Sequence, residues 1–380
     1  MDRVCWKCFE GSFDIEEFIR ANGTVSRCDF CRTTRIRTIS VEHLVEFLRE
    51  AFEKAYGSAV EDLPYDSAEG GYQGTTWSTA ELLLDHVDFP RDERNKLFLR
   101  LVGEIGDDTW CEYDWTSLEV DQALLIGWEH FCEAIKHHRR FFFQEFGVDA
   151  DDHDSISPAR MLDVILRWVH ELKLIRTLKS GEIVYRARAS SKMAPFTTAQ
   201  ELGPPPVEAA LQANRMNPIG IPMFYVADRK ETAIAETPGN ELSLGHFRIL
   251  KDLRVVDLAK LPPVPGFFSS ESREKRQTIQ FLYKFRDAIE QPVARDNAAH
   301  LDYLPSQVVT EYVRERGVHG MVIDGVCYRS AKISGALNYV FFATSANVVP
   351  KAKSKWYELP QDLWFKLTKS ETKKIRNRGS

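Results

Sequence analysis

Apolar residues recur every three or four positions along the first half of the chain, which predicts amphipathic helices. In residues 41–52 this apolar stripe is formed by Val41, Leu44, Val45, Leu48 and Phe52. Further segments with helical spacing are residues 79–87, 94–105, 117–146 and 157–175. The last of them opens with Ser157-Pro158, an N-cap followed by proline at the first helical position. We therefore expect residues 39–177 to form a bundle of four or five helices.

The pattern changes near residue 180, where short β-branched or aromatic runs are separated by Gly and Pro. The predicted strands are GEIVYRAR (181–188), IPMFYVA (221–227), LRVVDL (253–258), GMVIDG (320–325) and LNYVFFAT (337–344). Helical patterns intervene at residues 230–238, 272–292 and 306–317. Residues 178–350 are therefore predicted to form an α+β domain, and the whole chain a multidomain α+β protein.

Four of the seven cysteines form two C-x2-C pairs near the N-terminus. Cys5 and Cys8 make the first pair, and Cys28 and Cys31 the second. Two such pairs can complete one tetrahedral Zn²⁺ site, so residues 1–38 are predicted to be a structural zinc ribbon or knuckle. Four unrelated reduced thiols and a redox C-x2-C are the alternatives. The remaining cysteines are interpreted as buried packing residues; they are Cys111, Cys132 and Cys327.

Composition and charge limit the classes of function. With 43% apolar and 28% charged residues the chain is an ordinary globular protein, and its net charge of −6 gives no overall footprint for nucleic acid. Residues 351–380 are the exception, with nine Lys/Arg against three Asp/Glu, and are expected to be a basic C-terminal tail. The N-terminus has no apolar signal-peptide core and no apolar run reaches membrane length, so we expect a cytoplasmic protein that spans no membrane.

The motifs of residues 178–350 resemble the RES domain in order and spacing. They read GEIVYRARAS, NRMNPIGIPMFYVADRKETAIAE, YLPSQVVTEYVRERGVHGMVIDGVCYRS and NYVFF. Members of that family are NAD-consuming toxins of bacterial toxin–antitoxin modules, with a fold similar to ADP-ribosyltransferases. The resemblance therefore implies an ADP-ribosyltransferase-like domain in which NAD is the substrate.

The family's functional residues can be carried over position by position. The resemblance places the family arginine at Arg186, a second arginine at Arg215, and the tyrosine of the Y-x-A strand at Tyr225. It places the family glutamate at Glu236 and the serine at Ser330. The Y-[LI]-P-[ST]-Q segment corresponds to Tyr303–Gln307, which makes Gln307 a further candidate for substrate binding. An insertion at residues 191–213 is the main departure from a minimal member.

These residue types suit cleavage of the nicotinamide–ribose bond of NAD. The reaction passes through an oxocarbenium-like transition state that Glu236 could stabilise. Arg186 and Arg215 could hold the diphosphate, because the guanidinium fork binds oxygens bidentately. Tyr225 offers a flat face to the nicotinamide or its ribose, and Ser330 can orient ribose or amide. Each of these residues also has a plain structural interpretation, such as core packing for Tyr225.

The zinc-headed helical region resembles the N-terminal domain grouped with HEPN proteins, many of which are ribonucleases with an R-x4-6-H motif on a late helix. Here Arg37 with His43 and Arg295 with His300 match the spacing, but neither pair lies on a late helix of the predicted bundle. We therefore interpret both pairs as chance and expect a domain without nuclease activity, used for dimerisation, regulation or partner sensing.

Three functions remain open at this point. The first is NAD degradation with water or phosphate as acceptor, in a toxin or defence effector that arrests growth and is restrained by an antitoxin or another inhibitory partner. The second is transfer of ADP-ribose to a protein or nucleic acid. The third is a non-enzymatic zinc-containing regulator that binds nucleic acid or protein, with the basic tail as its contact surface. Homo-oligomers are compatible with all three.

Overall fold

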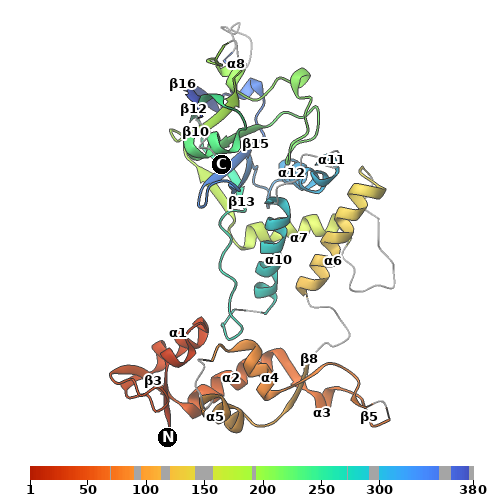
Figure 1. Ribbon diagram of the computed structural model, residues 1–380. Helices are drawn as coiled ribbons and strands as arrows, with labels where there is room; N and C mark the ends of the chain where they lie inside the picture. Colours follow the sequence, from red (N-terminus) through yellow and green to blue (C-terminus); the bar gives the residue numbers. More distant parts are fainter. Residues whose placement is uncertain are drawn as a thin grey trace. The chain divides into compact units, whose positions relative to one another are not determined.

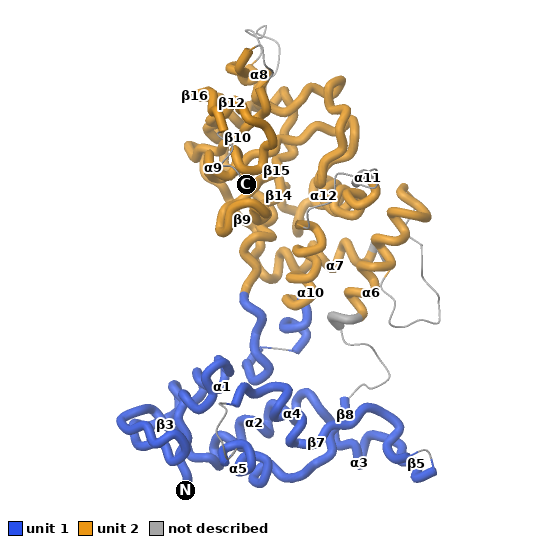
Figure 2. Tube along the Cα trace, in the orientation of Figure 1, with its two compact units in different colours: residues 1–120, 263–278 blue, residues 121–262, 279–380 orange. Residues whose placement is uncertain are grey.

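The chain divides into two compact units, and the division does not follow the order of the sequence (Figure 2). The computed structural model describes residues 1–68, 70–89, 96–112, 120–141, 157–190, 194–271, 273–290, 299–350 and 361–375. Unit 1 contains residues 1–120 and 263–278, and unit 2 contains residues 121–262 and 279–380. A stretch from the second half of the chain therefore belongs to the first unit.

Unit 1 contains two small three-stranded sheets, with strand orders β1-β3-β2 and β4-β8-β7, and a set of helices (Figure 1). Its elements are β1 (Arg3–Cys5), η1 (Trp6–Phe9), α1 (Phe13–Asn22), β2 (Thr24–Ser26), β3 (Ile36–Ser40), α2 (Val41–Ala55), β4 (Tyr56–Ser58), α3 (Ala59–Asp62), β5 (Tyr65–Asp66), β6 (Gly71–Tyr72), β7 (Thr76–Ser78), α4 (Thr79–His86), α5 (Lys96–Ile105) and β8 (Thr109–Glu112). Strands β5 and β6 pair with each other.

The apolar stripe predicted for residues 41–52 is confirmed as the buried face of α2. Ser40 caps this helix by accepting a hydrogen bond from the His43 amide at 3.3 Å, which satisfies one of the free donors of the first turn. Leu44, Leu48 and Phe52 are fully buried in the core of unit 1. Phe268, from the stretch 263–278, is buried in the same core.

The ring of His86, the last residue of α4, is held in an aromatic stack. It lies 3.8 Å from the ring of Phe267 at an interplanar angle of 7°, and its Nε2 is 2.9 Å from the Tyr56 hydroxyl. Burial, aided by the positive charge of Arg276, lowers the pKa of His86 to about 4. The imidazole is therefore neutral in the folded protein at neutral pH.

We expect unit 1 to lose stability as the pH falls from about 6.5 to about 4. Because the folded pKa is depressed, the unfolded chain binds a proton in this window before the folded chain does, and this favours unfolding. Denaturant unfolding followed between pH 7 and pH 4 measures the effect, with His86→Phe as the control that keeps the stack. The same pH dependence in His86→Phe as in the wild type would contradict the assignment.

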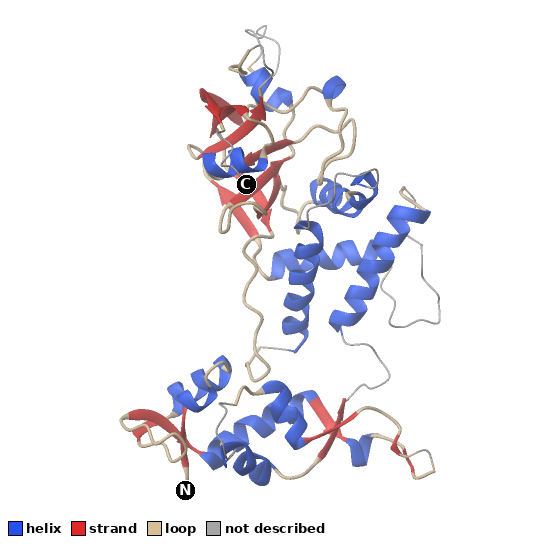
Figure 3. Ribbon diagram, viewed as in Figure 1, coloured by secondary structure: helices blue, strands red, loops and turns tan. Residues whose placement is uncertain are grey.

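Unit 2 is built on one mixed eight-stranded sheet, in the order β16-β12-β10-β11-β15-β14-β13-β9 (Figure 3). Its elements are α6 (Val120–Glu133), the π-helical turn η2 (Ala134–His138), α7 (Pro158–Glu171), β9 (Ile175–Leu178), β10 (Ile183–Ala189), α8 (Ala199–Leu202), η3 (Val207–Ala209), β11 (Phe224–Ala227), α9 (Lys230–Glu236), β12 (Glu241–Ile249), β13 (Leu253–Asp257), α10 (Arg273–Glu290), α11 (Ala299–Asp302), α12 (Leu304–Arg316), β14 (Gly325–Arg329), β15 (Leu337–Phe341), η4 (Ser345–Asn347) and β16 (Phe365–Lys374). Strands β13 and β14 are parallel, and every other paired strand is antiparallel to its neighbour.

Helices α6 and α7 belong to the core of unit 2, so the predicted bundle of residues 39–177 is not a single body. Trp128 of α6 and Ile165 of α7 share a buried cluster with Phe285 of α10 and Val326 of β14. Their apolar faces are covered by the sheet and its helices, whereas α2, α4 and α5 pack in unit 1. The helices themselves were correctly predicted, but periodicity carries no information about which partner each apolar face meets.

Two further corrections concern strands. GMVIDG was predicted as a strand, but the chain turns at this segment: the amide of Val318 donates to the Met321 carbonyl at 3.0 Å, and the strand β14 begins only at Gly325. The expected basic tail is in part an edge strand, because β16 pairs with β12 over residues 365–374. Residues 351–360 and 376–380 of this tail lie outside the described residues. Among the described helices, none is long and apolar enough to cross a membrane.

Candidate functional site

The four N-terminal cysteines converge as predicted. Cys5 ends β1 and Cys8 lies in the turn η1, while Cys28 and Cys31 lie in the loop between β2 and β3. The Sγ atoms are 3.9 Å apart for Cys5–Cys8, 3.4 Å for Cys5–Cys31 and 3.7 Å for Cys8–Cys28, and all four lie within 4.8 Å of one another. Four sulfurs bound to one Zn²⁺ at about 2.3 Å lie about 3.8 Å from one another. The residues therefore fit a closed tetrahedral site, with no position left for substrate.

A second cluster surrounds Glu236, the last residue of α9 in unit 2. Its half-buried carboxylate accepts two hydrogen bonds at Oε1, from Ser330 Oγ at 2.7 Å and from Asn338 Nδ2 at 2.8 Å. Helix α9 reaches this position because its small Ala233 packs against Ala227 of β11 and Ala187 of β10. No hydrogen bond among the described residues reaches Oε2, so this oxygen is available to a ligand.

The Ser330 hydroxyl has a fixed direction. Its oxygen accepts from the amides of Lys332 and Ile333, both at 3.1 Å, while the Ser330 amide donates to the Ala336 carbonyl at 2.9 Å. Because both lone pairs are used, the single proton of the hydroxyl can only point to Glu236. The turn after β14 therefore orients the carboxylate through Ser330.

Arg215 lies in a loop that is held from two sides. The buried side chain of Gln307 donates from Nε2 to the carbonyls of Asn214 at 2.8 Å and Asn217 at 3.1 Å. The hydroxyl of Tyr225 donates to Asn217 Oδ1 at 2.7 Å and accepts from the amide of Met216 at 3.2 Å. The side-chain amide of Gln307 and the hydroxyl of Tyr225 thus fix the loop of Arg215.

Tyr225 and Tyr328 lie near several charged side chains. Burial raises the pKa of both Tyr225 and Tyr328, so both phenols stay protonated. The charges of Arg186 and Arg215 act on the Tyr225 hydroxyl, and those of Arg215 and Glu236 act on the Tyr328 hydroxyl.

Strand register shows which face of the sheet carries each residue. Asn338 of β15 lies opposite Ala227 of β11 and opposite Tyr328 of β14, so these side chains share a face. Tyr225, two residues before Ala227, lies on it too. Hereafter this surface, which carries Tyr225, Tyr328 and Asn338 with Glu236 bound to Asn338, is called the Glu236 face.

Arg186 lies on the opposite face. Tyr185 pairs with Ala227, which puts Tyr185 on the Glu236 face and its neighbour Arg186 on the other one. The Arg186 guanidinium lies 5.5 Å from the ring of Phe224, its Nη1 is buried without a described partner, and burial lowers its pKa to about 10. The structure therefore brings Ser330 to Glu236 and the loop of Arg215 to Tyr225. It places Arg186 on the opposite face of the sheet, where its charge still acts on the Tyr225 hydroxyl.

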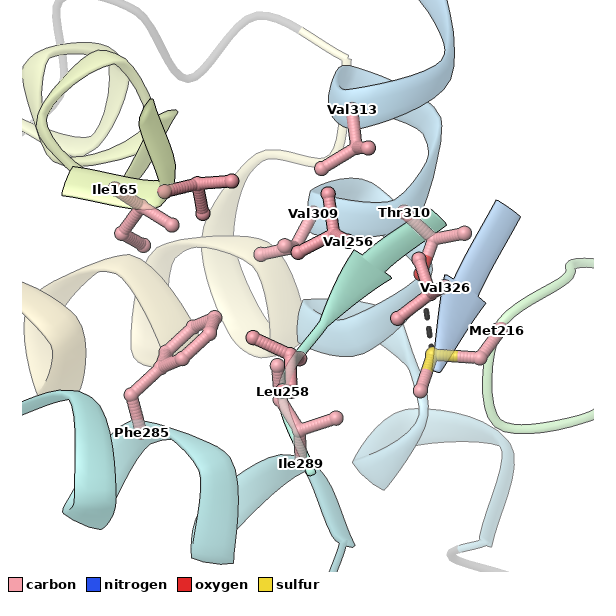
Figure 4. A pocket seen from close by; sticks show the side chains of 11 residues that line it. Ile165, Met216, Val256, Leu258, Phe285, Ile289, Val309, Thr310, Val313 and Val326 are labelled. Atoms are coloured by element: carbon pink, nitrogen blue, oxygen red, sulfur yellow. Dashed lines mark hydrogen bonds between the residues drawn. The ribbon is translucent and has the colours of Figure 1, made fainter. Parts of the chain in front are cut away.

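An apolar cavity lies behind the loop of Arg215, and Figure 4 shows the side chains that line it. It holds about 20 Å³, and it is closed by Met216, by Val309 and Thr310 of α12 and by Val326 of β14. The Thr310 hydroxyl donates to Met216 Sδ at 3.1 Å. Its small volume and almost wholly apolar lining do not suit a dinucleotide, so this cavity belongs to the core.

Replacing Gln307 by leucine is expected to lower the free energy of unfolding by about 2 kcal/mol, because two buried carbonyls lose their donor. The loop of Arg215 should loosen as well. Denaturant unfolding measures the loss. Gln212→Leu, a change at an exposed position of the same loop, is the control. Equal stability of both variants would contradict the role given to Gln307.

Asn338 and Tyr328 were missed at the level of sequence. The signal was present for Asn338, because an amide within the apolar run LNYVFF is buried in the structure and a buried amide must find a partner. Tyr328 is the tyrosine of the Y-x-S motif that marks Ser330, but only the pairing between β14 and β15 shows that it lies on the Glu236 face.

Comparison with protein families finds two domains in this chain. Residues 21–149 match the HEPN/RES N-terminal domain 1, and residues 183–366 match the RES domain. The first pair of zinc-site cysteines precedes the first match. Neither the curated proteins nor the solved structures that were searched contain a match to this chain.

Proposed function

Because this chain combines a RES domain with a HEPN/RES N-terminal domain 1, we propose that it cleaves the nicotinamide–ribose bond of NAD at the Glu236 face. RES domains are associated with NAD-related toxin activity. The single observation that carries the proposal is the carboxylate of Glu236, which is oriented by Ser330 and Asn338 and leaves Oε2 open. An ADP-ribosyltransferase-like arrangement of the domain is part of the proposal.

The reaction needs only one carboxylate. The bond between C1′ of the ribose and N1 of nicotinamide breaks, and its electron pair neutralises the pyridinium, so no acid is needed for the leaving group. Water or phosphate then bonds to C1′, and water gives up one proton to the solvent. The products are nicotinamide and ADP-ribose or its 1-phosphate. Glu236 stabilises the positive charge that develops on the ribose and accepts from a ribose hydroxyl at Oε2.

Arg215 is the arginine that we assign to the diphosphate. It lies on the side of Tyr225 and Tyr328, and its loop is fixed by Gln307. The tyrosine rings offer flat apolar surface to the nicotinamide and its ribose. Arg186 lies on the other face of the sheet beside Phe224, so we assign the diphosphate to Arg215 rather than to Arg186.

We expect Arg215→Met to raise the KM for NAD about 30-fold, because losing charge-assisted hydrogen bonds to the diphosphate costs about 2 kcal/mol. Arg186→Met is the matched control and should leave the KM within about twofold of the wild type, since surface and structural changes away from the substrate rarely exceed that. Both values come from initial rates of nicotinamide release. A larger increase in the KM for NAD in Arg186→Met than in Arg215→Met would show that the wrong arginine has been assigned to the diphosphate.

The proposal is tested by incubating the purified full-length protein with NAD labelled in the adenine ring. Free labelled ADP-ribose identifies water as the acceptor, and ADP-ribose 1-phosphate, formed only when phosphate is added, identifies phosphate. Label bound to protein or nucleic acid identifies the alternative ADP-ribosyltransferase. Intact NAD after prolonged incubation with folded, zinc-loaded protein would overturn the proposal.

An enzyme that depletes NAD must be restrained in its own cell. We propose a role as a toxin or defence effector that arrests growth, held in check by an antitoxin-like partner or by the N-terminal half. Expression of the intact gene and of the Glu236→Gln variant in the same host tests this role, because only the intact enzyme should lower cellular NAD and stop growth.

A further inference from the structure

The last turn of α10 contacts two separate segments of the site. The carbonyl of Ile289 accepts from Arg215 Nη1 at 2.6 Å. The carboxylate of Glu290 accepts from the amide of Arg329 at Oε1 and from its Nε at Oε2, both at 2.8 Å. Arg329 is the residue directly before Ser330.

The contact between Glu290 and Arg329 has the features of a strong ion pair. The Glu290 side chain is only 10% exposed, and its Oε2 also lies 2.7 Å from Arg329 Nη2. Asp287, one turn earlier, adds a bond to the same Nη2 at 2.9 Å. Charge-assisted bonds from several donors to one shielded carboxylate hold both backbone and side chain of Arg329 in one geometry.

Arg215 binds the main chain at the C-terminal end of α10. The last carbonyls of a helix have no partner within it and carry a partial negative charge, so they favour a guanidinium. Ile289 supplies such a carbonyl to Arg215. The remaining guanidinium donors of Arg215 have no described partner, which leaves them for a substrate.

We propose that Glu290 is a positioning residue: it fixes the turn at Arg329–Ser330 and thereby sets the direction of the Glu236 carboxylate. The effect of Glu290 on catalysis rests on the proposed function, whereas its anchoring of the turn does not depend on that function. The chain of contacts runs from Glu290 to Arg329, along the backbone to Ser330, and from the Ser330 hydroxyl to Glu236. The same helical turn fixes Arg215, so one element sets the carboxylate and the diphosphate arginine together.

Loss of the contact between Glu290 and Arg329 should lower the catalytic rate and leave NAD binding largely unchanged. If Arg329 is released, the turn that follows loosens, and Ser330 no longer holds Glu236 at one angle to the ribose. Misplacement of a catalytic group by about 1 Å can lower a rate about 100-fold. Arg215 keeps its bond to the Ile289 main chain in that case, so NAD binding should change little.

The experiment compares Glu290→Ala, Glu290→Gln and Arg329→Ala with the control Glu274→Ala, which alters an exposed residue at the other end of α10. Arg329 is 45% exposed, so its variant keeps the proposal testable if the Glu290 variants do not fold. Two readouts are used on the full-length protein. One is hydrogen–deuterium exchange of the peptide containing Lys332 and Ile333, and the other is kcat and KM for nicotinamide release.

We expect faster exchange in this peptide and a kcat lower by about tenfold or more in Glu290→Ala and Arg329→Ala, with KM for NAD within about threefold. Glu290→Gln keeps an acceptor for Arg329 and should be intermediate. The double variant Glu290→Ala/Arg329→Ala should be no slower than either single variant, because both break one contact.

Unchanged exchange in both alanine variants would overturn the inference, whether or not NAD is cleaved. Faster exchange with an unchanged kcat would equally overturn it, because the turn would then not position Glu236. If the wild type releases no nicotinamide, the proposed function fails, and faster exchange would still support the anchoring of the Ser330 turn by Glu290.

Discussion

Replacing Glu236 by glutamine is expected to lower the kcat for nicotinamide release about 100- to 1000-fold while leaving the KM for NAD nearly unchanged. The glutamine carbonyl can occupy the place of Oε1 and keep the bonds from Ser330 and Asn338, so the local structure survives. Only the negative charge is lost, and that charge acts on the positive ribose of the transition state rather than on bound NAD.

The matched control is Glu231→Gln, in the first turn of the same helix. Glu231 is exposed and its carboxylate is 3.8 Å from Lys230, so this variant removes the same charge without touching the Glu236 face. Its kcat should equal that of the wild type. A Glu236→Gln enzyme with wild-type kcat would show that another group carries the chemistry.

Replacing Cys8 by serine is expected to remove the bound zinc and unfold the zinc-headed part of unit 1. Zinc binding to such four-cysteine sites contributes about 10 to 16 kcal/mol, so its loss should outweigh the stability of this small region. Because Cys8 is buried beside Phe9 and Ile15, loss of the metal should also expose apolar core. Zinc content and thermal unfolding followed by circular dichroism measure both effects.

Cys111→Ser provides the control for this prediction. Cys111 is a fully buried free thiol of unit 1 that lies outside the cluster, so the chemical change is the same. This variant should keep one equivalent of zinc and its melting transition. Retention of zinc by Cys8→Ser, or unchanged melting after the metal is lost, would contradict a structural zinc site.

Local features of the fold could be predicted from the sequence, because they depend on short-range patterns. The stripe of α2 and the Ser157-Pro158 start of α7 are of this kind. The partners of these elements could not be predicted, because an apolar face looks the same whichever core it joins. Helices α6 and α7 thus belong to unit 2, and residues 263–278 belong to unit 1.

The residues of the candidate site likewise fall into those that short motifs indicate and those whose position depends on distant partners. The motif spacing indicated Glu236 and Ser330, which contact each other in the structure, and the spacing of the cysteines indicated their cluster. That Arg186 lies on the face opposite Glu236 could not be predicted, because the face on which a strand residue lies depends on pairing with a distant strand. Asn338 and Glu290 act through contacts across about 100 and 40 residues of sequence, as their hydrogen bonds to Glu236 and Arg329 show, and no local pattern reports such contacts.

Our central proposal is that NAD is bound and cleaved on the Glu236 face of the sheet. A crystal structure of the Glu236→Gln variant with intact NAD tests it most directly. We predict that the nicotinamide ribose lies against residue 236, with the diphosphate at Arg215 and the nicotinamide beside Tyr225 and Tyr328. NAD bound on the opposite face beside Arg186 would contradict the account.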